Sequence, residues 1–503
     1  MANQRLQAEL LAEYYRYVMN DIPLRMIYVP EMKLVTRQFV ASHLRATIEA
    51  LTDQELREAK VLEALGTKAV GHMRYVREKV KYAILSHRWL EQETSYQQAI
   101  SGGIRGDDKL ERFCAVAGSY GIEFAWADTC CIDKSSSAEL DESIRSMFRW
   151  YENSEICIVH LAQTTVLDEL VADEWWIRGW TLQEFLAPER IKFLNKDWKA
   201  LTEADNDRAV NALLPLIEEA SGIGHKHARV FSPVPTNVGE KMAWAARRKT
   251  TRDEDVAYSL MGIFDVSLQI AYGEGKERAF VRLMEAIMRS GDPSVLHWAG
   301  PAASHRSSEA IPSSPACYVG QPSEGLTLGT AGVLLEKLDI AVTSRGLRIP
   351  MVVLPLRLTR RHSDASHAWV LECPIIPGAI VNANLTELPD LYIEAPRAEY
   401  ALGIFTYTRL VRTSNPGLFG SSMPYLLRRE LLDETKPEEG AGVENCNLGL
   451  RSADRSNVYC PREWVRILDR EYITLHIPGA HQPGTLNGSM FFVDKKYLEI
   501  VYL

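Results

Sequence analysis

The strongest constraint on the fold is an alternation of short apolar runs with amphipathic segments between residues 82 and 194. The runs have the length of buried strands: YAILS (82–86), IEFAWAD (122–128), EICIVHL (155–161) and RIKFL (190–194). Helical patterns separate them, over about 95–120, 138–151 and 175–187. Strands and helices that alternate in this order predict a parallel sheet with helices on both faces.

The segments on either side of this region have different patterns. A chain of 503 residues is too long for one compact core, so we expect several domains. The first 81 residues are mostly helical in pattern, apart from a strand-like piece, LRMIYVP, and period-two patterns dominate the end of the chain. The expected order is a helical extension (1–81), an α/β domain (82–235), a helical segment packing on it (236–299), a Ser/Pro/Gly-rich linker (300–332) and a β-rich domain (333–503).

Composition argues against several classes of protein. The net charge of −9 offers no general basic face for nucleic acid, and no apolar run reaches the roughly 18 residues of a membrane span. The eight cysteines form no CxxC pair, and acidic and amide residues interrupt the first 20 positions, unlike a signal peptide. His225 and His227 are too isolated to predict a metal site. We therefore expect a cytoplasmic protein without a metal.

Polar and aromatic residues follow the ends of the predicted strands, where open parallel sheets bind their ligands. The first strand ends at SHRW (86–89), the second at DTCCIDK (128–134), and the helix after the third carries WWIRGWTLQEF (175–185). The candidate site residues are Ser86, His87, Arg88, Trp89, Asp128, Asp133, Arg178, Trp180 and Glu184. Glu184 follows Trp180 by four positions, which places both on one face of the predicted helix.

Several blocks of this sequence resemble a known family. YAILSHRW, WADTCCIDKSSSAELDESIRSMFRWY, WWIRGWTLQEFLAP and RKTTRDEDVAYSLMGIFDV…YGEGKERAFVRL, within about 82–300, look like a fungal heterokaryon-incompatibility (HET) domain protein. HET domains are distantly similar to TIR domains, whose fold is flavodoxin-like, and WTLQEF resembles the WCxxEL motif of TIR domains. The resemblance implies a flavodoxin-like (TIR-like) α/β domain with helical flanks, followed by the β-rich domain.

The same resemblance implies an activity. Many TIR domains cleave NAD⁺ with the glutamate of that motif, and the matching position here is Glu184. The implied protein uses NAD⁺ or a related nucleotide as substrate, needs no cofactor, works as a homo-oligomer, and causes cell death together with an incompatibility partner. One carboxylate can stabilise the oxocarbenium-like state of nicotinamide release. Aromatic walls suit the rings of NAD⁺, and Arg88 or the Ser86–His87 backbone is expected to hold the diphosphate.

Each of these residues also has a simpler structural interpretation. Trp176 and Trp180 can fill a core, with Trp175 at the edge of the helix. His87 can be a core histidine, Arg178 can pair with an acid, and Asp128 can cap a loop. The alternative function is a non-catalytic signalling adaptor that kills by recruiting a partner through the HET domain.

Overall fold

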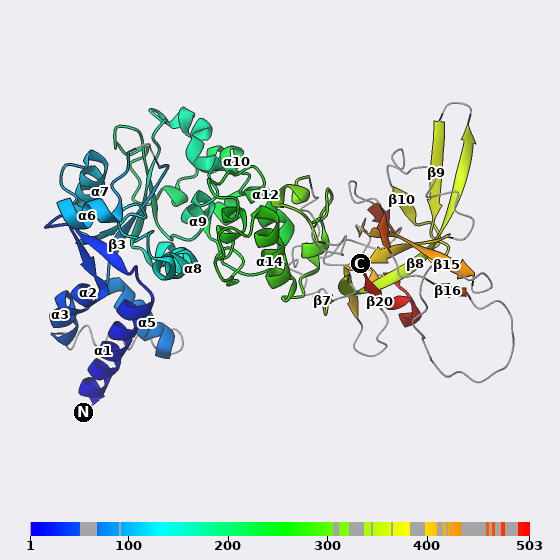
Figure 1. Cartoon of the computed structure of the whole chain (residues 1–503), viewed down its shortest axis with the longest axis horizontal. Helices are drawn as coiled ribbons and strands as arrows, with labels where there is room; N and C mark the ends of the chain where they lie inside the picture. The colour runs from blue at the N-terminus through cyan, green and yellow to red at the C-terminus, as the bar shows by residue number, and fades with distance from the viewer. Residues whose placement is uncertain are drawn as a thin grey trace. The chain divides into compact units, whose positions relative to one another are not determined.

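The computed structural model describes most of the chain. The described residues are 2–50, 68–89, 92–304, 311–320, 337–343, 346–363, 366–382, 398–409, 416–418, 421–422, 424–433, 459–461, 465–467, 474–477 and 491–503. They form two compact units (Figure 1). Unit 1 comprises residues 1–235 and 247–279, and unit 2 comprises residues 236–246 and 280–503.

Unit 1 is built around a six-stranded sheet. Its strands are β1 Arg25–Tyr28, β2 Lys33–Thr36, β3 Tyr82–His87, β4 Phe124–Trp126, β5 Ile156–His160 and β6 Ile191–Leu194, in the order β2-β1-β4-β3-β5-β6. The pairs β3–β4, β3–β5 and β5–β6 are parallel, which confirms the predicted α/β architecture. The LRMIYVP piece forms β1, and the β1–β2 hairpin extends the sheet with antiparallel strands that the parallel pattern did not include.

Helices cover both faces of this sheet. The described α-helices of unit 1 within residues 2–186 are α1 Ala2–Asn20, α2 Arg37–His43, α3 Arg45–Glu49, α5 Lys68–Lys79, α6 Tyr96–Gly102, α7 Asp108–Ser119, α8 Ser137–Asn153 and α9 Thr181–Leu186. Figure 1 shows α7 on one face of the sheet and α8 and α9 on the other, as right-handed crossovers require. The single helix predicted over about 95–120 is two helices, because Gly103 and Gly106 adopt positive φ between them.

Shorter elements complete unit 1. They are η1 Leu167–Ala172, η2 Glu174–Ile177, η3 Asp207–Ala209, α10 Leu214–Ser221, α11 His225–Arg229 and α13 Asp255–Tyr258. The helix predicted over 138–151 is confirmed as α8, whose buried face includes Ile144, Met147 and Tyr151. Ser136 caps α8 by accepting a hydrogen bond from the Glu139 backbone N–H at 3.4 Å.

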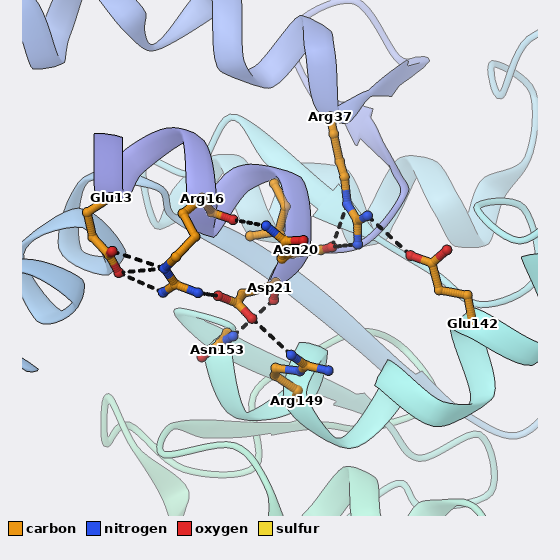
Figure 2. Close-up of polar contacts among 9 residues, drawn as sticks. Glu13, Arg16, Asn20, Asp21, Arg37, Glu142, Arg149 and Asn153 are labelled. Carbon is orange, nitrogen blue, oxygen red and sulfur yellow. Dashed lines mark hydrogen bonds and ion pairs between the residues drawn. The ribbon is translucent and has the colours of Figure 1, made fainter. Parts of the chain in front are cut away.

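Charged side chains hold the end of α1 against α8 (Figure 2). The Asp21 carboxylate, 8% exposed, accepts hydrogen bonds from Arg16 at 2.8 Å and from Arg149 of α8 at 3.0 Å. The buried Arg37 donates to a backbone carbonyl just after α1 and to Glu142 of α8 at 3.2 Å. The segment before residue 82 is therefore joined to the sheet by β1 and to α8 by ion pairs.

Unit 2 is rich in antiparallel strands, which confirms the predicted β-rich region. Its strands are β7 Ala341–Thr343, β8 Gly346–Ser363, β9 Ser366–Glu372, β10 Ile380–Asn382, β11 Ala398–Ile404, β12 Tyr407–Arg409, β13 Pro416–Leu418, β14 Ser421–Ser422, β15 Tyr425–Asp433, β16 Tyr459–Pro461, β17 Val465–Ile467, β18 Thr474–His476, β19 Phe491–Phe492 and β20 Leu498–Tyr502. The long strand β8 pairs antiparallel with β7, β9, β11 and β20. Unit 2 also contains helix α12 Val238–Ala245 and the 3₁₀ turns η4 Pro293–Leu296, η5 Pro315–Tyr318 and η6 Lys495–Tyr497. The division between the two units falls within α14 Lys276–Met288.

Candidate functional site

The parallel strands of unit 1 reverse their order at β3. The chain runs from β3 to β4 on one side and then returns to β5 on the other side of β3. Open α/β sheets bind ligands at the carboxyl ends of strands where such a reversal occurs. Ser86 and His87 end β3 at this point, and His160 of β5 is paired with His87 in the register of the two strands.

Glu184 meets the end of β3 through a chain of buried hydrogen bonds. The Ser86 hydroxyl donates to Glu184 Oε2 at 2.5 Å, and Trp175 Nε1 donates to the Ser86 oxygen at 2.8 Å. Ser86 and Trp175 are fully buried, and Glu184 is 6% exposed. The hydroxyl therefore satisfies both an indole N–H and a carboxyl oxygen that would otherwise lie unpaired in the interior.

The surroundings of Glu184 favour its neutral form. Burial, followed by the charge of Asp128, raises the pKa of Glu184 from 4.5 to about 8. The Ser86 hydrogen bond, the charge of Arg178 and the Tyr151 hydroxyl oppose this rise. At pH 7 the carboxyl group is therefore mostly protonated, and a cation brought close to it would favour its ionisation.

The segment before Glu184 is not the single helix predicted over 175–187. A 3₁₀ turn ends at Ile177 and α9 begins at Thr181, so Arg178, Gly179 and Trp180 form a break. A remote strand-like segment fixes this break: the Gly179 N–H donates to the Lys249 carbonyl at 2.8 Å. A Cβ at Gly179 would lie 2.4 Å from the Thr250 methyl group, so the close approach requires glycine.

Trp89, Asp128 and Arg178 come together beside Glu184. Trp89 is 41% exposed, and its Nε1 donates to Asp128 Oδ2 at 2.9 Å. Lys134 Nζ lies 3.8 Å from the centre of the Trp89 ring, and Arg178 Cζ lies 5.9 Å from it. An exposed indole flanked by two cations provides a flat surface next to positive charge.

His87 and Arg88 have different surroundings from each other. The His87 ring is buried, and neither ring nitrogen has a hydrogen-bond partner within the described part of the chain. Burial, reinforced by the nearby charge of Lys109, lowers the pKa of His87 well below its usual value, so the ring is neutral. Arg88 is only partly buried and forms an ion pair with Glu174.

Two of the predicted site residues serve other contacts. Asp133 accepts hydrogen bonds from the backbone N–H and the hydroxyl of Ser135, so it closes a turn before α8. Trp180 Nε1 donates to Asp255 Oδ2 at 3.0 Å, which ties the start of α9 to α13. Neither contact involves Glu184.

Sequence reasoning missed several groups that surround Glu184 and Ser86. Trp175 was expected at a helix edge, but it is fully buried and bonded to Ser86. Tyr151 was expected only as part of the α8 core, and its hydroxyl also donates to the Leu85 carbonyl of β3 at 2.9 Å. No sequence pattern points to Arg248, because its partners are remote along the chain.

Metal binding and membrane insertion are two further properties that side-chain grouping and helix composition determine. Within the described residues, no group of three or more His, Cys, Asp or Glu side chains is arranged to hold a metal ion. Nor does any helix among those residues have the length and apolar character to cross a membrane.

Part of the chain is similar to known proteins. The family model described as heterokaryon incompatibility protein (HET) matches residues 82–169, from the start of β3 into η1. The chain is also 44% identical over 225 residues to the vegetative incompatibility protein HET-E-1 of Podospora anserina. That match covers 41% of this chain and 16% of the relative, so the chain spans only a fraction of the relative's length.

Residues 82–169 therefore match the HET family model, and the chain is similar to a vegetative incompatibility protein over 225 residues. No solved structure matches the chain at a significant level. Glu184 lies beyond the residues that the family model matches, although it is hydrogen-bonded to Ser86 within them.

Proposed function

We propose that this protein acts in heterokaryon incompatibility, and that its HET domain hydrolyses the nicotinamide–ribose bond of NAD⁺ with Glu184 as the catalytic carboxylate. The observation that carries the proposal is the buried Glu184 carboxyl group, which is hydrogen-bonded to Ser86 at the end of β3. Asp128, whose charge acts on Glu184, also accepts a hydrogen bond from the exposed Trp89 ring. The parallel strands also follow the order of flavodoxin-like sheets, which supports the TIR-like fold that the sequence motifs imply.

The reaction needs little more than one carboxylate. The C1′–N bond breaks, its electron pair goes to the nicotinamide nitrogen, and nicotinamide leaves as a neutral molecule. The ribose carries an oxocarbenium-like charge, which an ionised Glu184 stabilises. Water then forms the new C1′–O bond and loses a proton, so that NAD⁺ and water give nicotinamide, ADP-ribose and H⁺.

The substrate itself brings the cation that ionises Glu184. The pyridinium ring of NAD⁺ is positively charged, and a positive charge near a buried carboxyl lowers its pKa. In the free protein the pKa of Glu184 is about 8, so kcat/KM rises with pH through this value. In the complex the same group ionises at a lower pH, and kcat therefore reaches its plateau earlier.

The exposed residues beside Glu184 suit the rest of the dinucleotide. The Trp89 ring offers a surface for a base or the nicotinamide, and such a stack contributes about 1 kcal/mol. Arg178 and Lys134, which lie near the same ring, supply the positive charge that a diphosphate needs. Arg88 is less suited to the diphosphate than the sequence suggested, because Glu174 already pairs with it.

The low exposure of Glu184 links activity to assembly. At 6% exposure the carboxyl group is held by Ser86 in a resting arrangement. We propose that self-association of the HET domain opens this arrangement to substrate. The homo-oligomer is thus the active form, and an incompatibility partner would promote it.

Nicotinamide release from NAD⁺ tests the proposal. The 503-residue chain is incubated with NAD⁺ over a range of protein concentrations, and wild type is compared with Glu184→Gln. A matched control is Glu189→Gln, since the Glu189 side chain is 81% exposed and lies just after α9. We expect release that rises more than linearly with protein concentration in wild type and Glu189→Gln, and loss of at least about 100-fold in Glu184→Gln.

The alternative is a non-catalytic adaptor. The observation that favours it is the same hydrogen bond, because a buried carboxyl satisfied by Ser86 can serve packing alone. Absence of nicotinamide release at every protein concentration, with all variants folded, would contradict NAD⁺ hydrolysis and favour the adaptor.

A further inference from the structure

Arg248 braces the break that precedes the Glu184 helix. Its Nη1 donates to the Arg178 carbonyl at 2.9 Å and to the Thr181 hydroxyl at 3.0 Å. These two acceptors lie on either side of Gly179 and Trp180, so one guanidinium group spans the break. Thr181 also donates to the Trp175 carbonyl at 2.6 Å, which connects the same turn to the tryptophan bonded to Ser86.

The guanidinium group of Arg248 also acts on Glu184 electrostatically. Its Nη2 is shielded from solvent, and burial lowers the pKa of Arg248 to about 9. The charge of Glu184 opposes this lowering. Because a charge interaction is mutual, we expect the guanidinium to favour the ionised form of Glu184 in return, in addition to Ser86, Arg178 and Tyr151, which also lower its pKa. An opposite charge nearby reduces the free-energy cost of removing a guanidinium group from water.

We propose that Arg248 is a positioning residue for Glu184, which fixes the Arg178–Thr181 turn and supplies a partly buried positive charge for the carboxylate. The residue comes from segment 247–279, which follows the excursion of the chain into unit 2. Segment 247–279 thus contributes a residue to the candidate site itself. The kinetic consequence of this assignment rests on the proposed function, whereas its effect on the ionisation of Glu184 does not.

The test must separate Arg248 from the other groups that face Glu184. These groups are Asp128 in the loop after β4, Tyr151 of α8, Cys157 of β5 and Arg178 before α9. All of them are retained when only Arg248 is changed. Arg248→Gln removes the charge, and Arg248→Lys keeps a charge but loses the planar fork that bonds two acceptors at once. Arg247→Gln, which changes the exposed neighbouring arginine, is the matched control.

The first measurement does not depend on activity. Infrared difference spectra over a pH series follow the protonated carboxyl band, which Glu184→Gln assigns to Glu184. We expect the pKa of Glu184 to rise by about 1 unit or more in Arg248→Gln, and to stay within about half a unit of wild type in Arg248→Lys and Arg247→Gln. An unchanged pKa in a folded Arg248→Gln protein overturns the assignment.

The second measurement uses the pH profile of nicotinamide release. If the pKa of Glu184 moves from about 8 to about 9, the ionised fraction falls about ninefold at pH 7 but less than twofold at pH 9.5. Arg248→Gln should therefore lose kcat/KM mainly at low pH, in addition to a pH-independent loss from the released turn. Arg248→Lys should show only the pH-independent loss, with the wild-type profile.

The outcomes distinguish the two proposals. If wild type releases no nicotinamide but the infrared shift appears in Arg248→Gln, the proposed function fails and the positioning role stands. If release is normal and neither the pKa nor the pH profile changes, the positioning role fails alone. Should Arg248→Gln not fold, as judged by circular dichroism, Arg248→Lys decides, since a shift above about 1 unit in the pKa of Glu184 there contradicts the charge assignment.

Discussion

Replacing Glu184 by glutamine should stabilise the protein, and the gain should grow with pH. The pKa of this carboxyl group is about 8 in the folded chain and 4.5 as an ordinary glutamate. The group is therefore neutral in the folded state where the unfolded chain has already ionised it. The contribution of Glu184 to the free energy of unfolding is largest below about pH 4.5. It is lost as pH rises toward 8, because ionisation stabilises the unfolded chain but not the folded one.

The size of the effect follows from the same two values. Each unit of pKa difference corresponds to about 1.4 kcal/mol, so wild type loses up to about 5 kcal/mol between pH 4.5 and pH 8 through this one group. A glutamine at this position keeps an oxygen that can accept the Ser86 hydrogen bond, but its amide group cannot ionise. The difference in the free energy of unfolding should therefore be small at pH 4.5, several kcal/mol at pH 8, and constant above pH 9.

Thermal and denaturant unfolding, followed by tryptophan fluorescence at pH 5, 6, 7, 8 and 9, would measure this difference. The fluorescence reports on Trp175 and Trp176, which are buried beside Glu184. Glu189→Gln is the control and should follow wild type at every pH, because its side chain is exposed. A difference between wild type and Glu184→Gln that stays constant within about 1 kcal/mol from pH 5 to pH 8 refutes the inference that burial keeps Glu184 neutral.

Three other changes test the packing of unit 1. Ser86→Ala leaves the Trp175 N–H and the carboxyl group unpaired, and it should lower the free energy of unfolding by about 2–4 kcal/mol, read from denaturant titrations. Asp21→Asn removes a carboxylate held by two arginines and should lower the melting temperature at low salt, with a smaller loss in 1 M NaCl if the charge is responsible. Gly262→Ala places a Cβ 2.2 Å from a phenylalanine Cβ of α8 and should destabilise by more than about 2 kcal/mol, whereas Gly102→Ala, with no atom within 4 Å, should be nearly neutral in the same melting assay.

The sheet could be predicted because its strands are local apolar runs. YAILS and EICIVHL have no polar interruption long enough to break a buried strand, and they form the neighbouring strands β3 and β5. The β1–β2 hairpin was less accessible to sequence reasoning. Its partner, β4, lies far along the chain, and the parallel pattern of the later strands says nothing about an antiparallel edge.

The site could be predicted only in part, for a related reason. Ser86 follows from the rule that strand ends carry the ligand groups, whereas Glu184 was singled out by the resemblance of WTLQEF to a TIR motif; the structure joins the two by a hydrogen bond. The helix expected over 175–187 was wrong because Arg178 forms a bridge with Lys249 and the Gly179 N–H donates to the Lys249 carbonyl, tertiary contacts that override the local helical pattern. Arg248 could not be predicted for the same reason, because its contacts depend on where the remote segment that contains Lys249 lies in the fold.

The central claim is that Glu184 cleaves NAD⁺, and a single-turnover measurement tests it most directly. Concentrated protein in excess over NAD⁺ is quenched at intervals at pH 8.5, where about three quarters of Glu184 is ionised, and nicotinamide and ADP-ribose are quantified together. We predict that both products appear in equal amounts with wild type and Glu189→Gln, and that neither appears at a comparable rate with Glu184→Gln. Equal rates for Glu184→Gln and wild type would contradict the assignment of the catalytic residue, and no product from any of the three would contradict the activity itself.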